Sequence, residues 1–127
     1  MGVSPLDLLD LDDLLSEQER GTRALARRVA DDHIRPAVAG WYESGGAPIR
    51  DLAVEFGKAG LLGMHLSGYG LGGSTAVSLG LACMELEAAD SGARSLVSVQ
   101  GSLVMYAIWR YGSDEQKHHW LPELAAG

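Results

Sequence analysis

Cysteine and aromatic residues are scarce in this chain. One cysteine, Cys83, occurs among 127 residues, and Phe, Trp and Tyr together make up 6% of them. A lone cysteine cannot form an intramolecular disulfide, which excludes the disulfide-stapled fold of many small secreted proteins. Because Cys83 lies among Leu81, Ala82 and Met84, we expect it to be a small buried hydrophobic residue of a cytoplasmic protein.

The chain also lacks long apolar runs and an excess of positive charge. No segment reaches the roughly 18 apolar residues of a membrane span, and no basic segment followed by an apolar run marks a secretion signal. The chain has ten Lys and Arg residues and 17 Asp and Glu residues, so its formal net charge is −7. An acidic chain is a poor partner for nucleic acid or an anionic membrane. We therefore expect neither partner, and no membrane span.

Two possible ligand motifs do not have the context that they need. His118 and His119 are adjacent and would point about 100° apart on a helix, so we expect no metal site. The hexapeptide GYGLGG at residues 68–73 matches the G-x-G-x-x-G pattern. That pattern binds dinucleotides when it follows a strand within a β-α-β unit. Residues 61–66 make a poor strand and no second strand follows, so we expect only a glycine-rich loop.

Helical spacing of apolar residues over most of the chain predicts an all-α bundle of about five helices. Capping boxes at Ser16–Glu19 and Ser113–Gln116 open the first and last of them. Pro36 should end or kink the first helix, and Trp41–Ala47 should be a loop. On the first helix we expect ion pairs four residues apart, such as Arg27–Asp31 and Arg28–Asp32. The expected helices cover residues 17–39, 49–59, 75–89, 94–111 and 114 onwards.

The helix at residues 94–111 has apolar side chains on nearly every side. They are Leu96, Val97, Val99, Leu103, Val104, Met105, Ile108 and Trp109. A helix of this kind needs neighbours all round, and we expect that this chain alone cannot supply them. Residues 1–15, which alternate leucine and aspartate, should form an acidic leader ahead of a single helical domain at residues 16–127.

Arg94 stands at the entrance of this central helix, where Asp90 or Ser91 is a plausible N-cap. A cation in the first turn is locally unfavourable, because the N-terminus of a helix carries partial positive charge. Its free N–H groups together with a guanidinium would instead suit a bound carboxylate or phosphate. The residues also allow a simpler interpretation, in which Arg94 pairs with Glu87 or lies in solvent.

The C-terminal segment YGSDEQKHHWLPELAAG resembles the YG-(S/T)-x-EQK-x-x-(Y/W)-LP-x-LA-(S/T/A)-G segment of the acyl-CoA dehydrogenases. The GLLGM and GYGLGG loop, the helix ending in EAADSG and the SVQGSLV segment match the family at the right separations. The resemblance runs from Leu11 to Gly127, and DSGARSLVSVQGSLVMYAI is most similar to the glutaryl-CoA dehydrogenases. The family usually opens the loop before Tyr69 with a proline and an acidic residue, whereas Ser67 and Gly68 stand here.

This resemblance implies the N-terminal helical domain of an FAD-dependent enzyme that oxidises an acyl-CoA to an enoyl-CoA. In that family a middle β-domain holds most of the flavin, and a C-terminal helical domain carries the catalytic glutamate. Both would be missing here, so the resemblance implies a fragment without a catalytic residue that should not turn over substrate by itself. The complete enzyme is expected to be a homo-oligomer.

The resemblance also implies a role for three residues. In glutaryl-type members, the residues matching Arg94, Ser95 and Glu87 bind the distal carboxylate of the substrate. We therefore expect these three to bind an acyl-CoA with a dicarboxylic acyl group. Two alternatives remain: a stand-alone, non-catalytic interaction module of the same fold, and part of a dehydrogenase for plain fatty acyl chains in which Arg94 only pairs with Glu87.

Overall fold

The computed structural model describes residues 11–127, and this part of the chain is mostly helical. It contains α1 (Glu17–His33), α2 (Val38–Ser44), α3 (Ile49–Lys58), α4 (Ala76–Glu87), α5 (Ser91–Ser98), α6 (Tyr106–Tyr111) and α7 (Asp114–Ala126). A 3₁₀ turn, η1 (Leu11–Leu14), precedes them, and a π-helical segment, η2 (Val99–Met105), joins α5 to α6. The predicted all-α fold is confirmed. None of the helices in the described residues is long and apolar enough to span a membrane.

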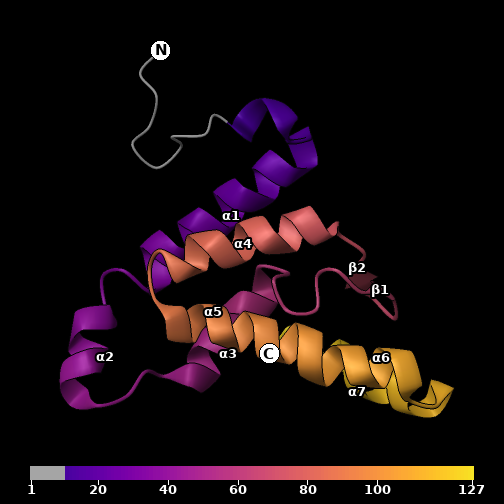
Figure 1. The fold of residues 1–127 in the computed structure, drawn as a ribbon. Coiled ribbons are helices and arrows are strands. Elements are labelled where there is room, and N and C mark those ends of the chain that lie inside the picture. The colour runs from indigo at the N-terminus through magenta and orange to yellow at the C-terminus, as the bar shows by residue number, and fades with distance from the viewer. Residues whose placement is uncertain (1–10) are drawn as a thin grey trace.

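The helices form a bundle in which α5, η2 and α6 make one continuous helical rod along one side (Figure 1). α1 packs along α4, and below them α5, η2 and α6 run on continuously before the chain turns back into α7. α3 packs against both α5 and α7. The core lies where these helices meet, and its largest fully buried hydrophobic side chains are Phe56, Ile34, Leu61, Leu86, Met105, Leu121 and Val97.

The first predicted helix is in fact two helices. α1 ends at His33 and α2 begins at Val38, with Pro36 in the turn between them. Proline has no N–H to donate and clashes with the preceding turn, so the break falls where the sequence placed a possible kink. The predicted loop at Trp41–Ala47 is wrong in its first half, because α2 continues to Ser44.

The predicted ion pairs of α1 are not those that form. Arg27 instead makes a two-point contact with Glu85 of α4, from Nε to Oε2 at 2.9 Å and from Nη2 to Oε1 at 2.7 Å. Asp31 accepts from Nε of Arg35 at 2.8 Å. The pKa of Arg27 is raised mainly by its hydrogen bond to Glu85, and the charge of Asp31 adds a smaller upward effect.

Both predicted capping boxes are present. Ser16 Oγ accepts from the backbone N–H of Glu19 while the Glu19 carboxylate accepts from that of Ser16, and Ser113 and Gln116 repeat the arrangement at α7. Of the predicted leader, residues 1–10 lie outside the described part of the chain. The described part of the chain begins with η1, where Oδ1 of Asp12 lies 2.6 Å from Nη2 of Arg23 in an ion pair.

Candidate functional site

A tight turn brings the end of α4 against the start of α5. Asp90 caps α5 and accepts from the backbone N–H of Ala93 at 2.8 Å through Oδ1. Asp90, one of the two predicted N-cap residues, is therefore the cap; the helix begins at Ser91, and Arg94 lies in its first turn. The sequence-based placement of Arg94 at a helix entrance is confirmed.

The guanidinium of Arg94 is held from two directions. Its Nε donates to Glu87 Oε2 at 2.6 Å, and its Nη1 donates to Ser98 Oγ at 3.3 Å. The Arg94 side chain is 36% exposed and that of Glu87 is 48% exposed, and the hydrogen bond to Glu87 is the main cause that raises the pKa of Arg94. The simpler interpretation of the sequence, in which these two residues pair, thus describes the chain without ligand.

Ser95 is less closely connected to this pair. It is half-buried beside Arg94, but its hydroxyl makes no hydrogen bond within residues 11–127. Consecutive helical residues point about 100° apart, so Ser95 and Arg94 lie on different sides of α5. The structure therefore brings together Arg94 and Glu87 of the three predicted site residues. It adds Ser98, which the sequence analysis missed although it lies four residues after Arg94, the spacing of helical neighbours.

Cys83 lies one turn before Glu87 on α4. Its apolar sequence neighbours predicted a buried side chain, but Cys83 is only half-buried. Burial raises the pKa of its thiol, and the charge of Arg94 partly opposes that effect. The thiol therefore stays protonated near neutral pH and adds no negative charge beside the Arg94–Glu87 pair.

The rod beyond Arg94 is buried on one side only. Val97 and Met105 are fully buried, whereas Leu103 is 66% exposed and Val99 is 46% exposed. We call the exposed apolar residues Val99, Leu103 and Val104 the outer face of the rod. Within residues 11–127 these three side chains stay largely exposed, as expected for a helix with apolar side chains on nearly every side.

His65 lies under the opposite, inner side of the rod. Its Nδ1 is buried and has no hydrogen-bond partner within the described residues. Burial lowers the pKa of His65 below its usual value of 6.5, because the charged imidazolium would lose its hydration there.

This lowered pKa predicts a pH-dependent stability. As pH falls below 6.5, the unfolded chain takes up a proton at His65 that the folded chain does not, so the free energy of unfolding should fall until the lowered native pKa is reached. Denaturant titrations at several pH values above 5 would measure this slope. In His65→Gln the slope should be smaller, and an unchanged slope would contradict the assignment. Glu19 and Glu55 have pKa values lowered from 4.5, so they contribute only at more acidic pH.

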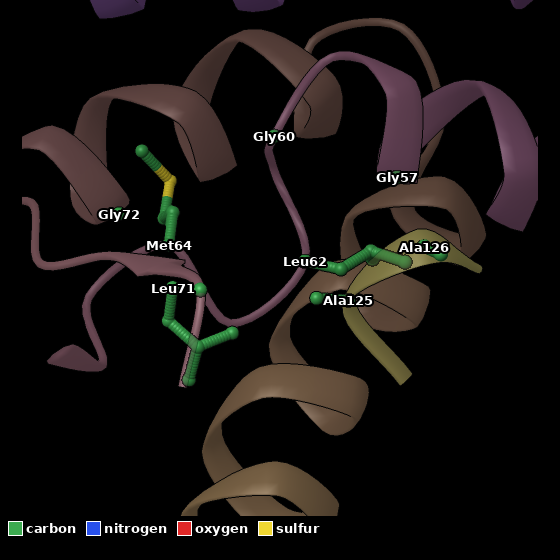
Figure 2. A pocket seen from close by; sticks show the side chains of 9 residues that line it. Gly57, Gly60, Leu62, Met64, Leu71, Gly72, Ala125 and Ala126 are labelled. Atoms are coloured by element: carbon green, nitrogen blue, oxygen red, sulfur yellow. The ribbon is translucent and has the colours of Figure 1, made fainter. Parts of the chain in front are cut away.

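The cavity found in the described chain is not at Arg94. It has a volume of about 350 Å³ and lies between the end of α3, the end of α7 and the hairpin of β1 (Ser67–Gly68) and β2 (Leu71–Gly72) (Figure 2). Its lining is small and apolar, with no charged side chain: Gly57, Gly60, Leu62, Met64, Gly70, Leu71, Gly72, Ala125 and Ala126. This volume is at the lower end of the roughly 300–1,000 Å³ of small-molecule pockets.

The glycine-rich segment makes a tight turn rather than a phosphate-binding loop. β1 (Ser67–Gly68) pairs with β2 (Leu71–Gly72) in an antiparallel hairpin. Tyr69 at its tip has a φ of 54°, in the left-handed region. Because the hairpin is antiparallel and the cavity lining has no charged side chain, the glycine-rich segment does not have the β-α-β context of a dinucleotide-binding loop. Residues 11–127 also contain no group of three or more His, Cys, Asp or Glu placed to hold a metal ion.

Comparison with known proteins agrees with this architecture. Residues 16–127 match the family described as acyl-CoA dehydrogenase, N-terminal domain. The acyl-CoA dehydrogenase FadE12 of Mycobacterium tuberculosis is 35% identical, over 74% of this chain and 27% of that protein.

Solved structures are more similar still. A crystal structure of a glutaryl-CoA dehydrogenase from Mycobacterium smegmatis in complex with FADH2 has a TM-score of 0.92 at 58% identity, over 98% of this chain and 32% of that one. Another structure of glutaryl-CoA dehydrogenase from that organism has a TM-score of 0.90 at 59% identity, covering 94% and 31%. The chain thus spans between 27% and 32% of these relatives. Since the match runs from the first capping box to the last residue and includes the helix of Arg94, the chain belongs to the acyl-CoA dehydrogenase family and has the fold of its N-terminal domain.

Proposed function

We propose that this chain is the N-terminal substrate-pocket domain of a glutaryl-type, FAD-dependent acyl-CoA dehydrogenase. In this proposal Arg94, assisted by Glu87 and Ser95, binds the distal carboxylate of a dicarboxylic acyl-CoA. The observation that carries the proposal is the position of Arg94: a half-exposed guanidinium in the first turn of α5, held in place by a carboxylate and a hydroxyl.

The charge and hydrogen bonds at Arg94 support a role in binding an anion. A guanidinium has five N–H donors, and its contacts to Glu87 and Ser98 use two of its three nitrogens. The second terminal nitrogen, Nη2, makes no hydrogen bond within residues 11–127 and can donate to a ligand. The partial positive charge at the start of α5 adds to the attraction of an incoming carboxylate. Glu87 then orients the guanidinium, and it also balances its charge when no substrate is bound.

The exposed apolar residues of the outer face also favour this proposal, because they could contact the apolar part of such a substrate. Val99 and Leu103 follow Arg94 and Ser98 along the same rod and are exposed. In this proposal the far end of the acyl chain contacts these residues, and its terminal carboxylate binds Arg94. Apolar contact of this kind would favour binding by about 0.8 kcal/mol for each buried methylene group.

The uncovered apolar surface and the share of the relatives that this chain spans support a multidomain enzyme. About two-thirds of the glutaryl-CoA dehydrogenase chain has no counterpart here, since 32% of it is covered. We propose that a β-domain and a C-terminal helical domain cover the outer face, enclose the acyl group, hold the flavin and supply the base. The flavin would accept the hydride as the acyl-CoA becomes an enoyl-CoA. This chain would bind and orient the acyl group and exclude water from it.

A chimeric enzyme tests this proposal. Residues 1–127 would replace the corresponding part of the Mycobacterium smegmatis glutaryl-CoA dehydrogenase, and kcat/KM would be measured for glutaryl-CoA and butyryl-CoA. Arg94→Ala should lower kcat/KM about 10- to 100-fold for glutaryl-CoA, as expected for a lost hydrogen bond between charged groups, and about 2-fold or less for butyryl-CoA.

Two controls make the result specific. Arg110→Ala, which removes an exposed arginine of α6, should leave kcat/KM unchanged for both substrates. Arg94→Lys keeps the charge but loses the forked geometry, so it should restore only part of the activity on glutaryl-CoA. Equal losses on both substrates in Arg94→Ala would refute the carboxylate role and favour a dehydrogenase for plain acyl chains. A chimera that binds no flavin would favour the non-catalytic interaction module.

A further inference from the structure

The rod that carries Arg94 is not a regular α-helix. Over η2 (Val99–Met105) the backbone N–H groups bond five residues back, as the N–H of Tyr106 does to the carbonyl of Gly101. π-helical turns are rare and are often found at functional sites. Since such a turn is less favourable than α-helix, contacts around it must hold it in place.

Those contacts are on the inner side of the rod, where two glycines meet. Gly101 is buried, and a Cβ atom at this residue would lie 3.2 Å from the backbone nitrogen of Gly63 and 3.3 Å from Cε1 of His65. Gly63 has a φ of 65°, and a Cβ there would collide with the side chain of Met105. The rod and the 61–66 loop are therefore in close contact, and a methyl group at residue 101 would fit only if the loop moved by a few tenths of an ångström.

Both ends of the rod are also held. Upstream, Arg94 is bound to Glu87 at 2.6 Å. Downstream, Nε1 of Trp109 donates to the carbonyl of Ser67 at 2.8 Å. Because the ends are fixed and packed helices do not deform continuously, the contact at Gly101 determines how far the middle of the rod lies from the loop. It therefore also determines how far the outer face projects.

We propose that Gly101 is a positioning residue that sets the depth of the acyl pocket. Its contact with Gly63 and His65 fixes the outward position of Val99 and Leu103, and with it the length of acyl chain that fits. This inference rests on the proposed function, because it takes the outer face to be the wall that the acyl chain meets. A methyl group at residue 101 would push that wall outward, and a smaller residue at 65 would let it settle inward.

The test uses the chimera with substrates that have no distal carboxylate. The measured quantity is the inhibition constant of hexanoyl-CoA against butyryl-CoA, divided by the KM of butyryl-CoA. Gly101→Ala should raise this ratio about 10-fold, since a single methylene that no longer fits changes binding by about 10- to 200-fold. Gly80→Ala is the matched control, because Gly80 is also helical but a Cβ there meets nothing within 4 Å. Its ratio should not change.

A second variant keeps the test valid if Gly101→Ala does not fold. His65→Ala removes the ring beneath Gly101 and adds no atoms, so the ratio should fall as the pocket deepens. A change of opposite sign in the two variants is not expected from general loss of structure. Unchanged ratios would overturn the proposal, and His65→Ala alone decides it if the alanine at residue 101 unfolds the enzyme. Because neither acyl-CoA carries a distal carboxylate, failure of the Arg94 experiment would leave this result unaffected.

Discussion

Replacing Phe56 with alanine is expected to lower the free energy of unfolding by about 3–5 kcal/mol, the usual loss for a buried phenylalanine. Phe56 is fully buried on α3 and belongs to the core cluster that joins α1, α3, α5 and α7. Single domains are stable by only about 5–15 kcal/mol. This domain leaves much apolar surface uncovered and should be near the lower limit, so the variant should be largely unfolded at 37 °C.

Urea titration followed by circular dichroism at 222 nm would measure the loss. Val54→Ala is the matched control, because Val54 lies on the same helix and is 38% exposed. It should cost less than about 1 kcal/mol, since little buried surface is lost and alanine has the higher helix propensity. Losses of similar size in the two variants would contradict the position of Phe56 in the core.

The second large loss of stability is expected at the ion pair between Arg27 of α1 and Glu85 of α4. Removing one partner should cost more stability than removing the other. The side chain of Glu85 is 11% exposed and that of Arg27 is 47% exposed. Arg27→Ala would leave a buried carboxylate without its partner, whereas Glu85→Ala would leave an arginine that water can reach. We expect the free energy of unfolding to fall by about 2–3 kcal/mol in Arg27→Ala and by about 1 kcal/mol in Glu85→Ala. The first value is below the 3–5 kcal/mol of fully buried pairs because Arg27 is half-exposed.

Thermal and urea unfolding of the two single variants and the double variant would measure both losses and the coupling between them. The double variant should lose less than the sum of the single ones, because removing Arg27 matters only while Glu85 is present. Lys58→Ala, which removes the exposed partner of Glu55 on α3, should leave the stability nearly unchanged. A larger loss for Glu85→Ala than for Arg27→Ala would contradict the burial that defines this pair.

Local signals in the sequence predicted most of the helices. The capping boxes at Ser16 and Ser113 open helices as expected, because a cap and its helix lie within one turn of chain. The same reasoning placed Arg94 at a helix entrance and rejected a dinucleotide loop at residues 68–73. It missed α2 because a short helix of seven residues between a proline and two glycines has little periodicity to detect.

The candidate site was predictable only in part. Charge and position suggested that Arg94 binds an anion or pairs with Glu87, and the structure contains the pair. The position of Ser98 next to Arg94 follows from helical spacing, but the partial burial of Ser95 depends on how α5 packs against its neighbours. The chimera tests the functional role of all three predicted residues.

By itself, the sequence determined which residues form most of the helices, where those helices are capped, and that one of them has apolar side chains on nearly every side. These features depend on residues within a few positions of one another. Only the tertiary structure decided that Arg27 pairs with Glu85 rather than Asp31, and that Gly101 lies against Gly63 under a π-helical turn. These contacts join segments far apart in the chain, and their geometry depends on how whole helices pack, which local spacing does not specify.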